Sequence, residues 1–221
     1  MTLRRLLQTL MGLLILRVTV HVLLSYRDYF PPNFESDFLR GRDSYFFGPY
    51  QWAFVVHILS GPCSLVVGMV LLSDWFRRRW PKWHRALGRI QVANVLGFMT
   101  PSGLWMAFYA ESGVVAGTGF AALAVATGFT VAMGWRTAMK RRFAEHQRWM
   151  WRCYVLLCSA VVLRVIGGLA TVTGFYSEWL YPVNAWACWI VPLLVLETLR
   201  VFSFAANSSS SPRGRRWPKA R

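Results

Sequence analysis

The sequence predicts an all-α integral membrane protein, a helical bundle of about six transmembrane helices with both termini in the cytoplasm. Three observations predict it. The 221 residues are 55% hydrophobic and only 15% charged, whereas a soluble domain carries about 25% charged residues. The apolar residues fall in runs of the length that crosses a bilayer as a helix, about 20 residues. The basic residues gather in short segments between these runs.

Six apolar runs define the predicted helices. The first, Leu6 to Ser25, follows a short basic start and contains no small-residue cleavage site, so we expect an uncleaved helix rather than a signal peptide. The others are, in chain order, Pro49 to Leu72, Gly88 to Ala110, Gly117 to Met139, Cys153 to Thr173 and Pro182 to Phe204. Residues 1–205 are therefore expected to form one transmembrane domain. Residues 206–221, rich in Ser and then basic, are expected to form a disordered tail.

The segments between the helices alternate in charge, which predicts the orientation. Residues 73–89, residues 140–152 and the tail are strongly basic, whereas the turns that contain Glu111 and Glu178 hold no Lys or Arg. Basic loops stay in the cytoplasm, so both termini are expected there. The 25 basic and 9 acidic residues give a net charge of +16. Because no soluble nucleic-acid module is present, we interpret this charge as topology and attraction to anionic lipids, with no nucleic acid as a partner.

Catalytic motifs give no indication of an enzymatic activity. The sequence contains no phosphate-binding glycine loop, no zinc-protease motif and no nucleophile elbow. The four cysteines have no paired spacing and lie in apolar runs, which is typical of small buried side chains rather than of a disulfide framework or a zinc site: Cys63, Cys153, Cys158 and Cys188.

Three charged residues lie well inside the predicted helices: Arg17, Arg164 and Glu197. A charge in a membrane helix costs several kcal/mol unless it is paired or wetted, so each is a functional candidate. At a rise of about 1.5 Å per residue, Arg164 lies about 16 Å and Glu197 about 10 Å from the inner boundary. An extended arginine spans that difference, which predicts an ion pair between Arg164 and Glu197 that either fastens two helices or belongs to a proton or substrate path. Arg17 has no evident acidic partner.

The four histidines form two pairs by depth. His57 lies in the outer third of its helix, as does His21, whereas His84 and His146 fall at the inner boundary. Two imidazoles at one depth are what a bis-histidine haem requires. One hypothesis is therefore a haem b protein that transfers electrons across the membrane, with His57, His84 and His146 as ligands and the haem iron as the one metal. A small-residue face follows His57 and offers either space for a porphyrin or close helix packing: Ser60, Gly61, Ser64 and Gly68.

Four arginines surround the inner histidines: Arg85, Arg89, Arg148 and Arg152. Guanidinium groups bind phosphate and carboxylate groups strongly. A second hypothesis is therefore a protein that binds or transports a small anion or a lipid at the inner boundary, with the Arg164–Glu197 pair as a switch. Neither hypothesis identifies the ligand or a redox partner.

Two motifs carry a family resemblance. Residues 83–90 contain an HR-x-LGR pattern, and residues 146–152 contain an H-x-RWM-x-R pattern, followed by Arg164 in a helix. Over about residues 51–200 the chain resembles the bacterial membrane protein family known as domain of unknown function 2306. The resemblance implies a multi-pass protein of the bacterial inner membrane with no established activity. It points to a cytoplasm-facing His/Arg site and to five residues for testing, although Gln147 stands where the family usually has Arg: His57, His84, His146, Arg148 and Arg164.

Overall fold

A computed structural model describes residues 3–36 and 38–209, and within this part the chain is helical and contains no strand. The long helices are α1 (Leu3–Leu24), α3 (Pro49–Leu72), α5 (Pro81–Asn94), α7 (Val114–Met139), α8 (Phe143–Leu157), α9 (Ser159–Thr173) and α10 (Leu180–Ser209). The short ones are η1 (Ser25–Asp28), α2 (Asp43–Phe46), α4 (Asp74–Arg79), the π-helical η2 (Val95–Met99) and α6 (Thr100–Ala107). Helix α10 therefore includes residues 206–209 of the predicted tail, and residues 210–221 lie outside the described residues.

The predicted all-helical membrane bundle is confirmed. Five stretches are long and apolar enough to cross a bilayer: Thr9–Asp28, Pro49–Leu72, Val114–Met139, Phe143–Thr173 and Leu180–Phe202. The remaining predicted run forms α5, η2 and α6 in unbroken succession. Large apolar side chains on the outside of the bundle are widely exposed, including Leu13, Leu59 and Leu194. Such a surface suits hydrocarbon rather than water.

Of the six predicted helices, the second keeps its expected bounds, and the third and the fifth differ from the expectation most. The third begins at Pro81 rather than Gly88, because proline at the first helical position has its φ already set and needs no hydrogen-bond partner. The same helix widens into η2 just before Pro101, whose ring would clash with the carbonyl of Gly97 in a regular α-helix. The fifth predicted helix is divided at Cys158 into α8 and α9.

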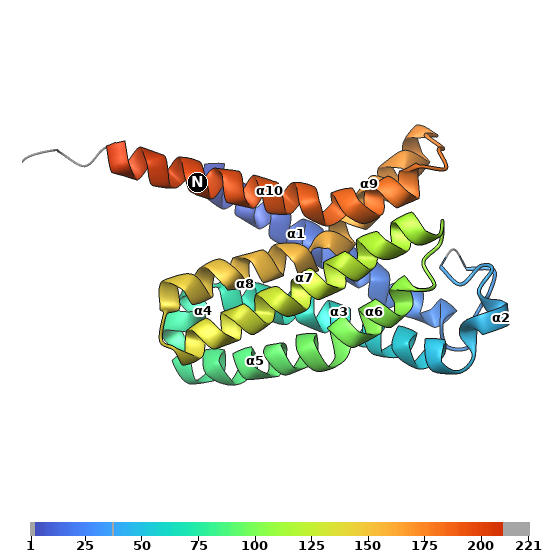
Figure 1. Cartoon of the computed structure of the whole chain (residues 1–221), viewed down its shortest axis with the longest axis horizontal. Coiled ribbons are helices and arrows are strands. Elements are labelled where there is room, and N and C mark those ends of the chain that lie inside the picture. Colours follow the sequence, from blue (N-terminus) through green and yellow to red (C-terminus); the bar gives the residue numbers. More distant parts are fainter. Residues whose placement is uncertain (1–2, 37, 210–221) are drawn as a thin grey trace, which may run out of the picture.

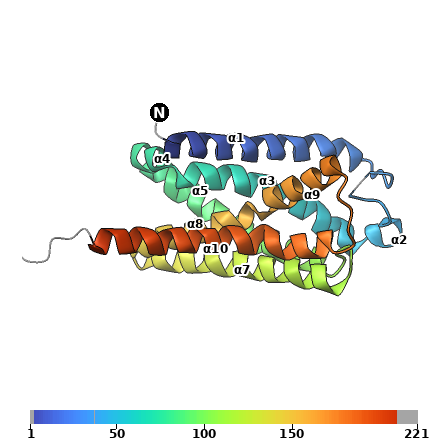
Figure 2. The ribbon, with the colours of Figure 1, turned by 90° about the horizontal axis from the view of Figure 1, so that it is seen from above.

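Figures 1 and 2 show which segments share each end of the bundle. The first turn of α1, helix α4, the start of α8 and the last turns of α10 lie together at the left of both views. We call this the basic end, because it holds the two basic runs at residues 77–79 and 140–142. The described ends of the chain thus lie on one side, as expected. Their placement in the cytoplasm follows from the positive-inside rule and stays a prediction.

The long loop between η1 and α3 forms an ordered cap over the other end of the bundle. Leu39 and Phe46 of this loop are buried against Tyr50 and Phe54 of α3. The Phe38 ring stacks on that of Phe54, with centroids 5.2 Å apart. We call residues 29–36 and 38–48 the loop cap. Its aromatic packing closes that end of the helix bundle with apolar side chains.

Candidate functional site

A cavity of about 220 Å³ lies among the helices beneath the loop cap. Residues of α3, α6, α7, α8, α9 and α10 line it, together with the loop cap and Val22 of α1. Most of the wall is apolar, with Phe54, Leu123 and Leu163 as examples. The polar lining includes Arg42, Tyr50, His57, Thr100, Arg164 and Tyr181. We call it the Arg164 cavity.

Arg164 enters this cavity from α9 and does not pair with Glu197, so the predicted Arg164–Glu197 ion pair is wrong. Its guanidinium donates a hydrogen bond to the carbonyl oxygen of Ala160, one turn earlier on the same helix, at 3.0 Å. No carboxylate of the described residues lies within ion-pair distance of it. Arg164 is therefore a cation at the wall of a largely apolar cavity, exposed within the structure and without a carboxylate partner among the described residues.

Glu197 pairs instead with Arg152 of α8. Nε and Nη2 of Arg152 donate to the two carboxylate oxygens of Glu197, at 2.8 and 2.9 Å. The Arg152 guanidinium also lies over the Trp149 ring, 4.6 Å from its centroid. Arg152 precedes Arg164 by about 18 Å along a helix, at about 1.5 Å per residue, and is nearer the basic end. The carboxylate on α10 thus meets the nearer arginine, which we had assigned to an anion site.

Arg200 is a further member of this ion-pair network that the sequence analysis missed. Its Nη1 lies 3.3 Å from Oε1 of Glu197, and its Nη2 donates to the backbone oxygen of Arg148 at 3.4 Å. The spacing of three residues between Glu197 and Arg200 was the available signal, because such residues are neighbours on a helix. The network joins α8 to α10 at the basic end.

Arg42 of the loop cap is the second arginine of the cavity and was also missed. Its side chain is only 7% exposed. It donates to the backbone oxygens of Phe38 and Tyr109, at 2.6 and 3.0 Å, and to the Tyr45 hydroxyl at 3.0 Å. Glu111 approaches it to 3.9 Å. Arg42 therefore serves as a clamp that holds the loop cap to the turn between α6 and α7.

His57 faces the cavity from α3 and is held by α6. Its Nδ1 lies 3.2 Å from Oγ of Ser102, whose hydroxyl donates to the backbone oxygen of Phe98 at 2.6 Å. The Ser102 hydroxyl already donates its proton to Phe98, so it can only accept from His57. We therefore assign the proton of His57 to Nδ1, which leaves the ring lone pair on Nε2. His21, in contrast, is exposed on α1 and does not line the cavity.

The small-residue face that follows His57 is occupied by protein side chains. Gln91 of α5 donates to the backbone oxygen of Ser64 at 3.1 Å, and Asn94 donates to Oγ of Ser64 at 2.8 Å. The ring of Tyr154 lies against Gly68. At Ser64 and Gly68 this face therefore serves close helix packing, and the space predicted there for a porphyrin is filled.

The structure brings His84 and His146 near each other at the basic end. Nδ1 of His146 lies 2.9 Å from the backbone oxygen of Gly134. Nδ1 of His84 is buried and has no hydrogen-bond partner among the described residues. His84 precedes the apolar part of its helix, and burial lowers its pKa below the ordinary value of 6.5, with the charges of His146, Arg77 and Arg85 acting in the same direction.

The four arginines predicted as one anion site do not form a ring around these histidines. Arg85 and Arg89 are exposed on α5, which packs on α3, α4 and α7 but not on α8. Arg148 and Arg152 lie on α8, where Arg152 is already paired with Glu197. The four side chains therefore lie on two helices that do not pack directly on each other, and one of the four is already paired.

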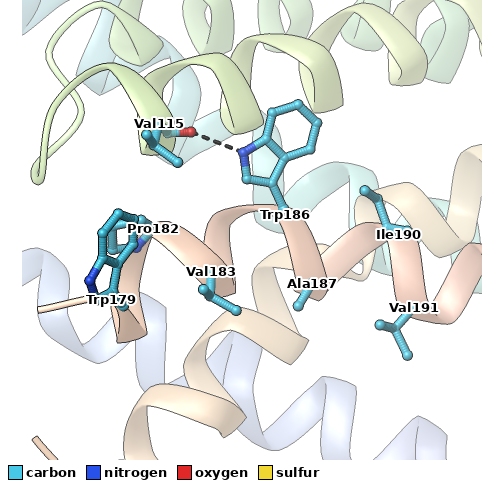
Figure 3. Close-up of a pocket in the computed structure, with 8 residues that line it drawn as sticks. All are labelled: Val115, Trp179, Pro182, Val183, Trp186, Ala187, Ile190 and Val191. Carbon is cyan, nitrogen blue, oxygen red and sulfur yellow. Dashed lines mark hydrogen bonds between the residues drawn. The ribbon is translucent and has the colours of Figure 1, made fainter. Parts of the chain in front are cut away.

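A larger hollow of about 330 Å³ on the outside of α7 and α10 carries no chemistry. Figure 3 shows its lining, which is Val115, Trp179, Pro182, Val183, Trp186, Ala187, Ile190 and Val191. Its polar contact is internal: the Trp186 indole nitrogen donates to the backbone oxygen of Val115 at 3.0 Å. An open apolar hollow of this kind on a membrane helix suits lipid chains. The Arg164 cavity is therefore the better candidate site.

A comparison with protein families identifies a match for most of the chain. Residues 54–200 match the DUF2306 family of predicted membrane proteins. No curated protein and no solved structure matches the chain. The matched range covers about two thirds of the chain and contains His57, His84, His146, Arg164 and Glu197, whereas Arg42 of the loop cap precedes it. The protein thus belongs to the DUF2306 family of predicted membrane proteins.

Proposed function

We propose that the protein binds a small organic anion in the Arg164 cavity, as the binding step of transport across the bacterial inner membrane. The observation that carries the proposal is the Arg164 guanidinium, which faces this cavity with no carboxylate of the described residues beside it. An unpaired charge in apolar surroundings is costly. A bound anion would offset that cost, and the planar guanidinium can bind a carboxylate through two hydrogen bonds.

The lining of the cavity favours a small acid with an apolar body. The volume of about 220 Å³ is below the range typical of pockets for drug-sized ligands, about 300–1,000 Å³. Phe54, Leu123 and Leu163 offer an apolar wall. Ligand sites between helices near the middle of the membrane are also typical of transporters. A monocarboxylate with an aromatic or branched apolar group combines these properties.

Benzoate and its neutral amide, benzamide, are matched probes for this proposal. The purified full-length protein in detergent is heated with each probe, and the unfolding midpoint is recorded. A ligand at about one hundred times its Kd stabilises the folded state by about 2.7 kcal/mol. We expect benzoate to raise the midpoint and benzamide to leave it unchanged.

Two arginine variants provide the internal control for the same measurement. Arg164→Gln removes the cavity cation, so benzoate should no longer stabilise the protein. Arg17→Gln removes the other arginine in the interior of a predicted membrane helix, which is exposed on α1 and outside the cavity, and should retain the benzoate response. Equal stabilisation by benzamide, or an unchanged benzoate response in Arg164→Gln, would refute the proposal.

A second candidate function uses the cytoplasm-facing His/Arg site at the basic end. The observation that favours it is the buried Nδ1 of His84, which has no hydrogen-bond partner among the described residues and is close enough to His146 for their charges to interact. Two imidazoles in this arrangement support the hypothesis of haem b ligation and electron transfer. The protein purified from haem-replete cells should then show a Soret band that His84→Ala and His146→Ala remove. A colourless wild-type protein would exclude this candidate.

A further inference from the structure

Buried polar side chains connect the Arg164 cavity with the basic end along the contact between α3 and α5. At the cavity, Oγ of Ser60 donates to the backbone oxygen of His57 at 3.2 Å. Asn94 then donates to the backbone oxygen of Ser60 at 3.2 Å and to Oγ of Ser64 at 2.8 Å. Gln91, one turn nearer the basic end, donates to the backbone oxygen of Ser64 at 3.1 Å. We call Ser60, Ser64, Gln91 and Asn94 the polar column.

The spacing of residues extends this column to the inner histidines. On α5, Gly88 follows His84 by four residues, and Gln91 follows Gly88 by three. The three residues therefore lie on one face of the helix. Gly88 leaves room on that face, since a Cβ atom there would meet nothing within 4 Å. Gly61 leaves similar room on α3, between His57 and Ser64. The column thus has open positions on both helices.

Three of the four buried side-chain polar atoms that have no hydrogen-bond partner among the described residues belong to residues at the ends of this column or beside it. Thr100 Oγ1 lines the cavity and faces Gly128 of α7. The ring edge of Tyr154 lies against Gly68, and its hydroxyl lies near the weakly accepting thiol of Cys158. The third is Nδ1 of His84 at the basic end. Tyr154 is only 8% exposed. Buried polar atoms are almost always satisfied by protein or by water, so these three atoms mark places for water.

We propose that the polar column conducts protons between the basic end and the Arg164 cavity. A proton from water at the basic end binds the His84 imidazole and passes along water and side-chain hydrogen bonds to His57. It is then released into the cavity, and no covalent bond other than those to the moving proton changes. The charged groups near the two stations are His146, Arg77 and Arg85 at His84, and Arg164 at His57. The path requires no bound anion, so it goes beyond the proposed function and holds without it.

Simple fastening of α3 to α5 is the competing explanation. Polar side chains often hold membrane helices together, and the amides of Gln91 and Asn94 do join the two helices. Fastening does not explain why Thr100 and His84, towards the two ends of the column, and Tyr154 beside it bury polar atoms that have no nitrogen or oxygen partner among the described residues. A continuous file of water explains both observations.

Proton influx into vesicles tests the proposal. The full-length protein is reconstituted into liposomes that contain a pH-sensitive dye, and a potassium diffusion potential drives protons inward. Wild-type vesicles should acidify faster than protein-free vesicles. Asn94→Leu should slow the protein-dependent rate about tenfold, which corresponds to about 1.4 kcal/mol of added barrier. Asn184→Leu is the matched control, because Asn184 is also a buried amide, donates to the backbone oxygen of Leu163 at 3.0 Å, and lies outside the column.

Gln91→Met is a second variant of the column that keeps the test valid if Asn94→Leu misfolds. It removes the amide of Gln91 at nearly constant side-chain volume. Every variant must elute as one peak in size-exclusion chromatography before reconstitution. The proposal is overturned if wild-type vesicles acidify no faster than protein-free ones, if Gln91→Met and Asn94→Leu both keep the wild-type rate, or if Asn184→Leu slows influx as much as Asn94→Leu. The benzoate experiment is scored separately, so a failure of anion binding is distinguishable from a failure of conduction.

Discussion

In the two halves of the bundle, Arg152 at the basic end and Arg164 under the loop cap differ in the partners of their guanidinium groups. At the basic end, Arg152 has a two-point ion pair with Glu197 and an aromatic ring beneath it. Under the loop cap, Arg164 donates a hydrogen bond to a carbonyl oxygen of its own helix and has no carboxylate partner among the described residues. Paired charges in a membrane protein hold helices together. An unpaired charge in a membrane helix is costly and is therefore a candidate for a functional role. The difference supports a structural role for Arg152 and the proposed binding of an anion by Arg164.

The largest expected effect comes from breaking the pair at the basic end. Glu197→Gln leaves Arg152 and Arg200 without their shared carboxylate, so we expect a loss of about 2 kcal/mol, the scale of a hydrogen bond to a charged group. Thermal unfolding of the purified protein measures it. Glu178→Gln, an exposed carboxylate outside the network, is the control. An equal midpoint in both variants would contradict the structural role of the pair.

A steric change tests the packing between the two halves. A Cβ atom at Gly68 would lie 2.8 Å from the Tyr154 ring, so Gly68→Ala should destabilise the fold by about 1–3 kcal/mol. Gly61→Ala is the control on the same helix, since its Cβ would meet nothing within 4 Å, and alanine favours the helix by up to about 1 kcal/mol. The two variants should therefore shift the unfolding midpoint in opposite directions. A drop of similar size in both would show that Tyr154 does not pack as described.

The two arginines should also respond oppositely to the same substitution. Arg164→Met removes an unpaired charge from the cavity and should raise stability by about 1 kcal/mol, while abolishing the benzoate response. Arg152→Met should lower stability, because it leaves Glu197 without its main partner. Both are read from thermal unfolding without ligand. If both variants are destabilised equally, Arg164 has a structural role and the contrast between the halves fails.

The smallest effect concerns the pH dependence at the basic end. Burial lowers the pKa of His84, with His146, Arg77 and Arg85 adding to the shift, so the folded protein favours the neutral ring. The unfolded chain binds the proton with a pKa of about 6.5. The contribution of His84 is therefore present above that pH and is lost as the pH falls below it. His84→Gln should flatten the loss of stability between about pH 7 and pH 5, while Gln147→Ala should leave it unchanged.

Sequence reasoning succeeded where the signal is local. The predicted helix at Pro49–Leu72 forms with those bounds, and the basic runs do gather at one end of the bundle. Hydropathy and charge act on each segment through its own contact with lipid or water, so neither requires knowledge of a neighbouring helix. The approach of His84 to His146 was also predictable, because both precede apolar runs that start at the same boundary.

The partners of the charged side chains were decided by the tertiary structure. By distance along the helix axis, Arg164 could have met Glu197. The helix is divided at Cys158, however, and Arg152 lies nearer, so Glu197 pairs with Arg152. The Arg164 cavity needed six helices and the loop cap to form. Sequence alone thus determined which segments form long apolar helices and in which order. Only packing decided which side chains meet, because contacts between helices depend on their rotation and lateral neighbours, which hydropathy does not encode.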